Sequence, residues 1–140
     1  MAIQQGLTTS FKQQMVQGQQ NLSSNTLKMA LYTAFATLGP ETTTYSVTNE
    51  VTGTGYTAGG NLMFGVTINT SPDGVVYINF DNVVWPSAAF TVRGALIYNV
   101  SQGNASVAVL DFGSDKTCSN QTFTVTMPTN TATTALIRFP

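Results

Sequence analysis

The glycine-rich stretch TNEVTGTGYTAGGN, residues 48–61, has the composition of a phosphate-binding loop. A loop of the P-loop type needs a lysine and a hydroxyl residue directly after its last glycine, but Asn61 follows Gly60. The glycines of this stretch also lack the G-x-G-x-x-G spacing of a dinucleotide-binding turn. We therefore interpret them as positions that permit positive φ angles and close backbone approach.

The triplet DFG at residues 111–113 matches the magnesium motif of protein kinases only in its letters. The chain has neither the H-R-D sequence nor the V-A-I-K lysine that act with that motif, and it is too short for a kinase domain. Asp111 and Asp115 have the spacing D-x-x-x-D, which is a weak calcium signal beside the alternating acidic residues of an EF-hand. We expect a strand that ends here and turns into GSDK.

The chain contains no histidine, which removes serine–histidine and cysteine–histidine triads and the commonest general base. Cys118 follows Lys116 closely in a polar stretch, but no base or orienting partner accompanies it. A small hydrolase would have to use two carboxylates that converge on a concave site. The sequence predicts no catalytic residue, no metal site and no cofactor.

Trp85 is the single tryptophan, and a proline that we expect to end its strand follows it. Its first interpretation is an anchor in the core or at its rim. The alternative is an exposed indole that stacks on sugar rings together with Tyr56 or Tyr98. The two interpretations differ in whether the indole is buried.

The composition limits the classes of partner. Only 8% of the 140 residues are charged, and the formal net charge is −1 at pH 7. The lysines and arginines are scattered, whereas nucleic-acid binding needs them clustered. No apolar run is long enough to span a membrane, and the N-terminus lacks the pattern of a signal peptide. A single cysteine forms no intrachain disulfide, so we expect synthesis in a reducing cytoplasm.

The periodicity of apolar residues indicates the elements that position these side chains. The segment TTSFKQQMVQG predicts a short amphipathic helix over about residues 10–17, with Thr9 or Ser10 as its cap and Gly18 at its end. The apolar stripe of this helix consists of Phe11, Met15 and Val16. We expect it to cover an edge of the domain or to dock on a partner.

From residue 27 onward the apolar period becomes two, which predicts strands. LKMALYTAF places Leu27, Met29, Leu31 and Phe35 on one face. NLMFGVTIN and VVYINFD, joined by SPDG, predict one hairpin, and TVRGALIYNV and ASVAVLDF, joined by SQGN, predict another. QTFTVTMP and TTALIRF are expected as further strands. The predicted fold is all-β, an antiparallel β-sandwich that is jelly-roll-like, with about seven strands.

Residues 37–60 break this alternation and predict a long loop rich in glycine and threonine. Compact domains rarely carry such a loop without a use for it, whether as a lid, a binding loop or a reach toward a neighbour. The predicted organisation is an N-terminal arm with a short helix over residues 1–26 and a single β-sandwich domain over residues 27–140.

Six blocks stand in order along the chain: SFKQQMVQG, LKMALYTAFATLG, TTTYSVTNEVTGTGYTAGGNL, RGALIYN, VAVLDFGSDKT and TFTVTMPTN. Together they resemble a family of small virion proteins of tailed bacteriophages, which includes the capsid cement, or decoration, proteins of short-tailed phages such as one of Bordetella. The resemblance implies a jelly-roll-like β-sandwich that forms homodimers on the outer surface of an icosahedral head. It also implies that the protein bridges major capsid proteins with an HK97-like fold.

The leading functional hypothesis is therefore a structural virion protein rather than an enzyme. A surface of few charges and many threonine, serine, asparagine and glutamine residues suits packing against other protein. We predict as partner contacts Phe11 and Met15 in the helix and Asn49, Glu50 and Tyr56 in the loop. The alternative is a tail- or fibre-associated module that binds a host surface glycan, and a small acidic hydrolase is the third hypothesis.

Overall fold

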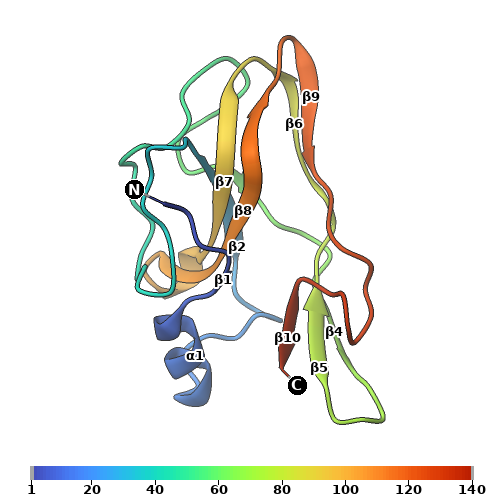
Figure 1. Ribbon diagram of the computed structural model, residues 1–140. Coiled ribbons are helices and arrows are strands. Elements are labelled where there is room, and N and C mark those ends of the chain that lie inside the picture. Colours follow the sequence, from blue (N-terminus) through green and yellow to red (C-terminus); the bar gives the residue numbers. More distant parts are fainter. Residues whose placement is uncertain (1, 140) are drawn as a thin grey trace.

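The structure, a computed structural model, describes residues 2–139 (Figure 1). Its regular elements are ten β-strands, one α-helix and one short 3-10 helix, and every pairing between the named strands is antiparallel. The predicted all-β class with one short helix is confirmed. Met1 and Pro140, the ends of the predicted arm and domain, lie outside the described residues.

The largest sheet has five strands in the order β1-β8-β7-β2-β3. The alternating segments β2, β7 and β8 form its centre, and β7 pairs with β8 as the sequence predicts. The edge strand β1 was not predicted, because two residues are too few to show a period. The strand predicted over NLMFGVTIN is divided in the structure into β3 and β4, which belong to different sheets. The bounds of the five strands are β1 Gly6–Leu7, β2 Leu27–Tyr32, β3 Asn61–Leu62, β7 Thr91–Asn99 and β8 Ala105–Thr117.

Two smaller sheets form the second layer, on the right in Figure 1. One has the order β10-β5-β4, and its β4–β5 hairpin turns at the predicted SPDG sequence. The other pairs β6 with β9. The bounds are β4 Thr67–Thr70, β5 Val76–Asn79, β6 Val83–Ala88, β9 Gln121–Val125 and β10 Ile137–Phe139.

Pro86 does not end its strand, as we had expected, but lies inside β6. The pairing of β6 with β9 shifts register between Trp85 and Ala88, and Ser87 there has a φ of 53°. Proline has no backbone N–H to donate, so a strand accommodates it at such an irregularity.

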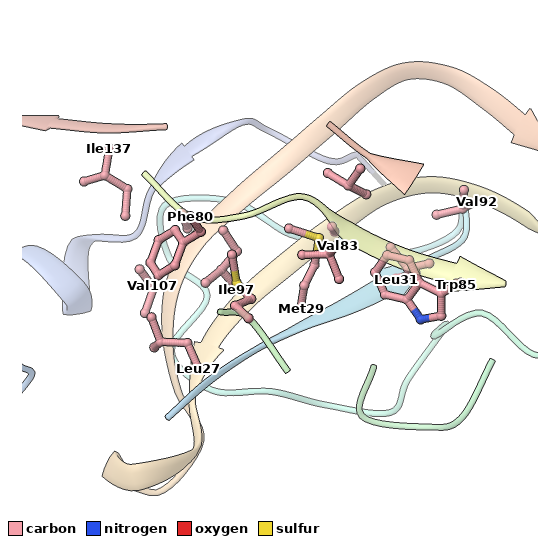
Figure 2. Close-up of a cluster of buried hydrophobic side chains, with 14 of the residues drawn as sticks. Leu27, Met29, Leu31, Phe80, Val83, Trp85, Val92, Ile97, Val107 and Ile137 are labelled. Carbon is pink, nitrogen blue, oxygen red and sulfur yellow. The ribbon is translucent and has the colours of Figure 1, made fainter. Parts of the chain in front are cut away.

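The main core lies between the two layers (Figure 2). Its side chains come from alternate positions of the central strands and from the facing layer, and they are buried almost completely. Figure 2 labels Leu27, Met29, Leu31, Phe80, Val83, Trp85, Val92, Ile97, Val107 and Ile137. Phe35 is an exception among the predicted inward residues, because β2 ends at Tyr32 and the Phe35 side chain is 68% exposed.

The helix α1, Thr9–Val16, begins one residue earlier than predicted and packs against β8. Its cap is Thr8, whose Oγ1 accepts a hydrogen bond of 3.3 Å from the Phe11 N–H. Phe11 is fully buried in the main core, whereas Val16 is 89% exposed, so the predicted apolar stripe is divided between core and surface. No helix within residues 2–139 is both long and apolar enough to cross a membrane.

Candidate functional site

Residues 37–60 run from the segment after β2 to the start of β3 without a regular helix or strand. The part up to Tyr45 lies over the face of the five-stranded sheet that points away from the main core, on the left in Figure 1, whereas Val51 and Tyr56 pack in or against the main core. Leu38 and Tyr45 belong to a second apolar cluster on this face, and the Tyr45 ring stacks on Tyr98 with centroids 4.7 Å apart. The loop is therefore packed against its own sheet along much of its length.

A single carboxylate organises this loop. Glu50 is only 6% exposed, and its Oε1 accepts a hydrogen bond of 2.6 Å from the Tyr45 hydroxyl. Its Oε2 accepts from the Tyr56 hydroxyl and, at 2.8 Å, from the Gly59 N–H. Within residues 2–139, no lysine or arginine forms an ion pair with this carboxylate. We call Glu50, Tyr45, Tyr56 and Gly59 the Glu50 hub.

The hub is joined directly to the sheet. The Leu31 N–H in β2 donates to the Tyr56 hydroxyl at 2.9 Å, and the Tyr98 hydroxyl in β7 donates to the Gly59 carbonyl at 2.6 Å. The Val51 N–H donates to the Leu31 carbonyl at 2.9 Å, next to the antiparallel bridge between Tyr32 and Glu50. Strands and loop thus share one hydrogen-bond network.

The electrostatics keep the phenols of this network protonated. Burial, followed by the charge of Glu50, raises the pKa of Tyr98 to about 12. Burial also raises the pKa values of Tyr45 and Tyr56 well above 10, and their hydrogen bonds to Glu50 raise them further. A protonated phenol can donate, and the carboxylate accepts from each.

The chemistry open to this arrangement is limited. A general base must accept a proton from a substrate, but both oxygens of Glu50 are already engaged by donors of the chain. No group of three or more histidine, cysteine, aspartate or glutamate side chains that could hold a metal ion occurs within the described residues. The Glu50 hub is best described as a polar anchor for the loop.

The glycines of the opening stretch have an architectural role. Gly60 has a φ of 79°, and a Cβ there would collide with the Met29 carbonyl of β2. Gly55 has a φ of 86°, and a Cβ there would lie 2.8 Å from the Ser87 carbonyl oxygen. Positive φ angles and close backbone approach are thus both required, as the sequence predicts.

The predicted partner contacts occupy different environments. Phe11 is buried in the main core and Glu50 is buried in the hub, so neither side chain lies at the surface of this structure, and their role as partner contacts stays a prediction. Met15 and Tyr56 are half-buried and pack against the core. Asn49 is exposed. The partner roles of Met15, Asn49 and Tyr56 stay predictions.

The apolar residues that do reach the surface of this region were not predicted. Phe35 is 68% exposed and Val47 is 64% exposed. Alternation continued past the end of β2 places Phe35 inward, and Val47 lies in the polar segment TTTYSVTNE, which shows no apolar period. The signal that could have found them is the break of period after Tyr32.

The aromatic residues proposed for sugar stacking are not exposed. Trp85 is 1% exposed and Tyr98 is 3% exposed, so neither presents a ring face to a ligand. Trp85 instead lies among Tyr56 and Phe123, with centroid distances of 6.4 and 5.9 Å. The core interpretation of Trp85 is confirmed.

The acidic residues around DFG are engaged by a cation. Arg93 in β7 lies 3.9 Å from Asp111 and 3.4 Å from Asp115, measured between guanidinium nitrogen and carboxylate oxygen. The pairing of β7 with β8 skips residues 112–115, which places both carboxylates near the same guanidinium. The weak calcium signal therefore marks a surface ion-pair cluster at a β-bulge.

An open groove of about 600 Å³ lies between the β1–β8 edge and the segments around β9 and β10. A second hollow, of about 320 Å³, lies beside the loop. Among the described residues, neither is lined by aspartate or glutamate, so neither provides the two convergent carboxylates that an acidic hydrolase needs. Apolar lining residues of the groove are Leu110, Phe112, Val125, Met127, Leu136 and Ile137.

Searches against protein-family models, curated proteins and solved structures find no significant match to this chain.

Proposed function

We propose that this protein is a capsid cement, or decoration, protein of a tailed bacteriophage. In this proposal it is a jelly-roll-like sandwich that binds as a homodimer to the outer surface of the head and bridges neighbouring major capsid proteins. The six ordered sequence blocks that resemble phage virion proteins are its first support.

The structural observation that carries the proposal is a charge-poor surface with large apolar side chains exposed on it. The most exposed of these are Val16 at 89%, Phe35 at 68%, Val47 at 64% and Phe64 at 64%. Only 8% of the residues are charged, so little desolvation of charge opposes packing against another protein. Such a surface favours permanent association over catalysis.

Cementing needs no chemistry beyond preferential binding. A protein that binds the assembled shell but not free subunits stabilises the shell by mass action. Symmetry repeats the same contact at equivalent positions, so a modest affinity at each position suffices when one domain engages two subunits.

The structure does not show the exposed aromatic surface on which the glycan-binding alternative was based. Its stacking surface required an exposed Trp85 together with Tyr56 or Tyr98, and Trp85 is buried. A tail or fibre location would now need a different binding surface.

The copy number in purified virions tests the proposal. Quantitative mass spectrometry against the major capsid protein should find hundreds of copies, on the order of one per capsid subunit. A handful of copies would place the protein at the neck, tail or fibres and favour the alternative. Absence from virions would overturn both.

A further inference from the structure

We propose that residues 33–36 and 46–49, which we call the apex, are a preorganised docking element that inserts Phe35 and Val47 into an uncharged apolar socket of the major capsid protein. The inference rests on the proposed function and specifies the surface that performs it. It moves the contact from the buried Phe11 and Glu50 to side chains that are at the surface.

The apex exposes apolar area without any charge. Phe35 is 68% exposed and Val47 is 64% exposed, although both belong to segments that are tied to the domain. The apex sequences TAFA and SVTN contain no charged residue. A partner that covers these side chains gains the free energy of removing apolar area from water, and a partner without charges does so at the least desolvation cost.

Hydrogen bonds fix the two halves of the apex to each other. The Thr33 N–H and Thr33 Oγ1 both donate to the Asn49 carbonyl, at 3.0 and 3.1 Å. The Asn49 Nδ2 donates in return to the Phe35 carbonyl at 3.0 Å. Phe35 is therefore held by Asn49 from the opposite segment, and Asn49 is a positioning residue.

The backbone of Asn49 is held in an uncommon conformation. Its φ of 61° lies in the left-handed region, which asparagine tolerates better than most residues. Such a conformation persists only where its surroundings determine it, and it occurs preferentially at binding and active sites. Here it turns the chain so that the Asn49 amide reaches across to the other segment.

Two further hydrogen bonds tie the apex to Glu50 and to β2. The Glu50 N–H donates to the Val47 carbonyl at 3.1 Å, and the Tyr32 hydroxyl donates to the Ser46 carbonyl at 2.6 Å. Because these segments are already ordered, docking orders little additional backbone, and more of the contact energy appears as affinity.

A hollow beside the apex completes the surface. Its volume of about 320 Å³ is bounded by Tyr32, Ala36 and Leu38 together with the threonine and serine residues of the loop. None of its lining residues is charged. The surface therefore offers a partner an apolar projection next to a neutral cavity with hydroxyl groups, which fits a neutral segment that carries its own apolar side chain.

The test is a binding titration of shells assembled from the major capsid protein alone. The double variant Phe35→Ser/Val47→Ser should bind at least about tenfold more weakly than the wild type, as expected for the loss of central apolar contacts. The matched control is Ile68→Ser, which removes an apolar side chain that is 48% exposed in β4. The control should bind within about twofold of the wild type.

Co-sedimentation with quantitative mass spectrometry measures the bound protein, and the unfolding midpoint of each variant shows that the fold is retained. A Phe35→Leu variant, which keeps a large apolar side chain at this position, should retain most of the wild-type binding. If the wild type binds the shells and the double variant binds them equally well, the apex inference is overturned and the cement function still stands. Failure of the wild type to bind shells would overturn the cement function and the partner assigned to the apex.

Discussion

The two faces of the five-stranded sheet are covered in different ways. Strands of the second layer cover one face, and their apolar side chains meet those of β2, β7 and β8 (Figure 2). An irregular loop covers the other face, and a buried carboxylate with three donors holds it there. Apolar packing thus holds the cover on one face of the sheet, and directed hydrogen bonds hold the cover on the other face.

The difference teaches what each kind of cover requires. Apolar packing is non-directional and distributes its stabilisation over many contacts. The hub concentrates stabilisation in a few bonds to one charged group, and each bond depends on the others because a buried polar group left without a partner is costly. A loop without strands can therefore be as well placed as a strand when one acceptor gathers its donors.

The largest effect is expected from breaking the strand-covered face at Phe11. Phe11→Ala removes a fully buried ring that stacks near Phe139, with centroids 6.5 Å apart, and should lower the free energy of unfolding by about 3 to 5 kcal/mol. Denaturant unfolding measures this change, with Met15→Ala on the same helix as a half-buried control of smaller effect. A Phe11→Ala variant as stable as the wild type would show that the ring is not part of the core.

Breaking the loop-covered face at Glu50 should have a smaller and more local effect. Glu50→Ala leaves the Tyr45 and Tyr56 hydroxyls and the Gly59 N–H without their acceptor, and should cost about 3 kcal/mol. Glu50→Gln keeps the shape and one acceptor oxygen, so its loss should be less. Hydrogen exchange should show faster exchange in residues 37–60 while β7 and β8 stay protected.

Equal loss of protection in the loop and in the β7–β8 hairpin would contradict this expectation. It would mean that the two covers form one cooperative unit, and that the carboxylate contributes to the whole domain rather than to its own face.

The smallest effect at neutral pH, and the sharpest contrast between the faces, is expected from alkaline titration. The pKa of Tyr98 is raised to about 12 in the folded protein, against about 10 in an unfolded chain. Its stabilising contribution is complete below pH 10 and is lost as the pH rises through 12, because the unfolded chain releases the proton first. In a pH titration, the tyrosinate absorbance of the protein should rise at a higher pH than that of free tyrosine, until the loop opens.

Glu50→Gln provides the control for this titration. Removal of the carboxylate charge should lower the pH at which Tyr45, Tyr56 and Tyr98 ionise, since that charge is among the causes of each raised pKa. Unchanged titration in the variant would show that burial alone is responsible.

The sequence predicts the regular parts of the fold well, because their signals are local. Alternation over β7 and β8 with SQGN between them, and the SPDG turn between β4 and β5, identify two hairpins. The helix is predicted to within about a residue for the same reason. Its one-residue error comes from Thr8, which caps the helix while its hydroxyl also lies 2.8 Å from that of Ser106.

The candidate site could not be predicted to the same extent, because its contacts are non-local. Nothing in the stretch around Glu50 shows that Tyr98, far along the chain, will share its network. An acidic residue in a polar loop normally faces water, so only the structure shows that this one is buried. The exposure of Phe35 likewise depends on where β2 stops.

The position of the only tryptophan gives the molecule a built-in optical reporter. The Trp85 indole belongs to the strand-covered core, and its ring centroid lies 6.4 Å from that of Tyr56, whose hydroxyl binds Glu50. Its N–H is buried and has no hydrogen-bond partner among the described residues, which favours blue-shifted fluorescence. The emission spectrum of Trp85 is therefore sensitive to both faces of the sheet. Release of the loop moves Tyr56 away from the indole, and separation of the two layers exposes the indole to water.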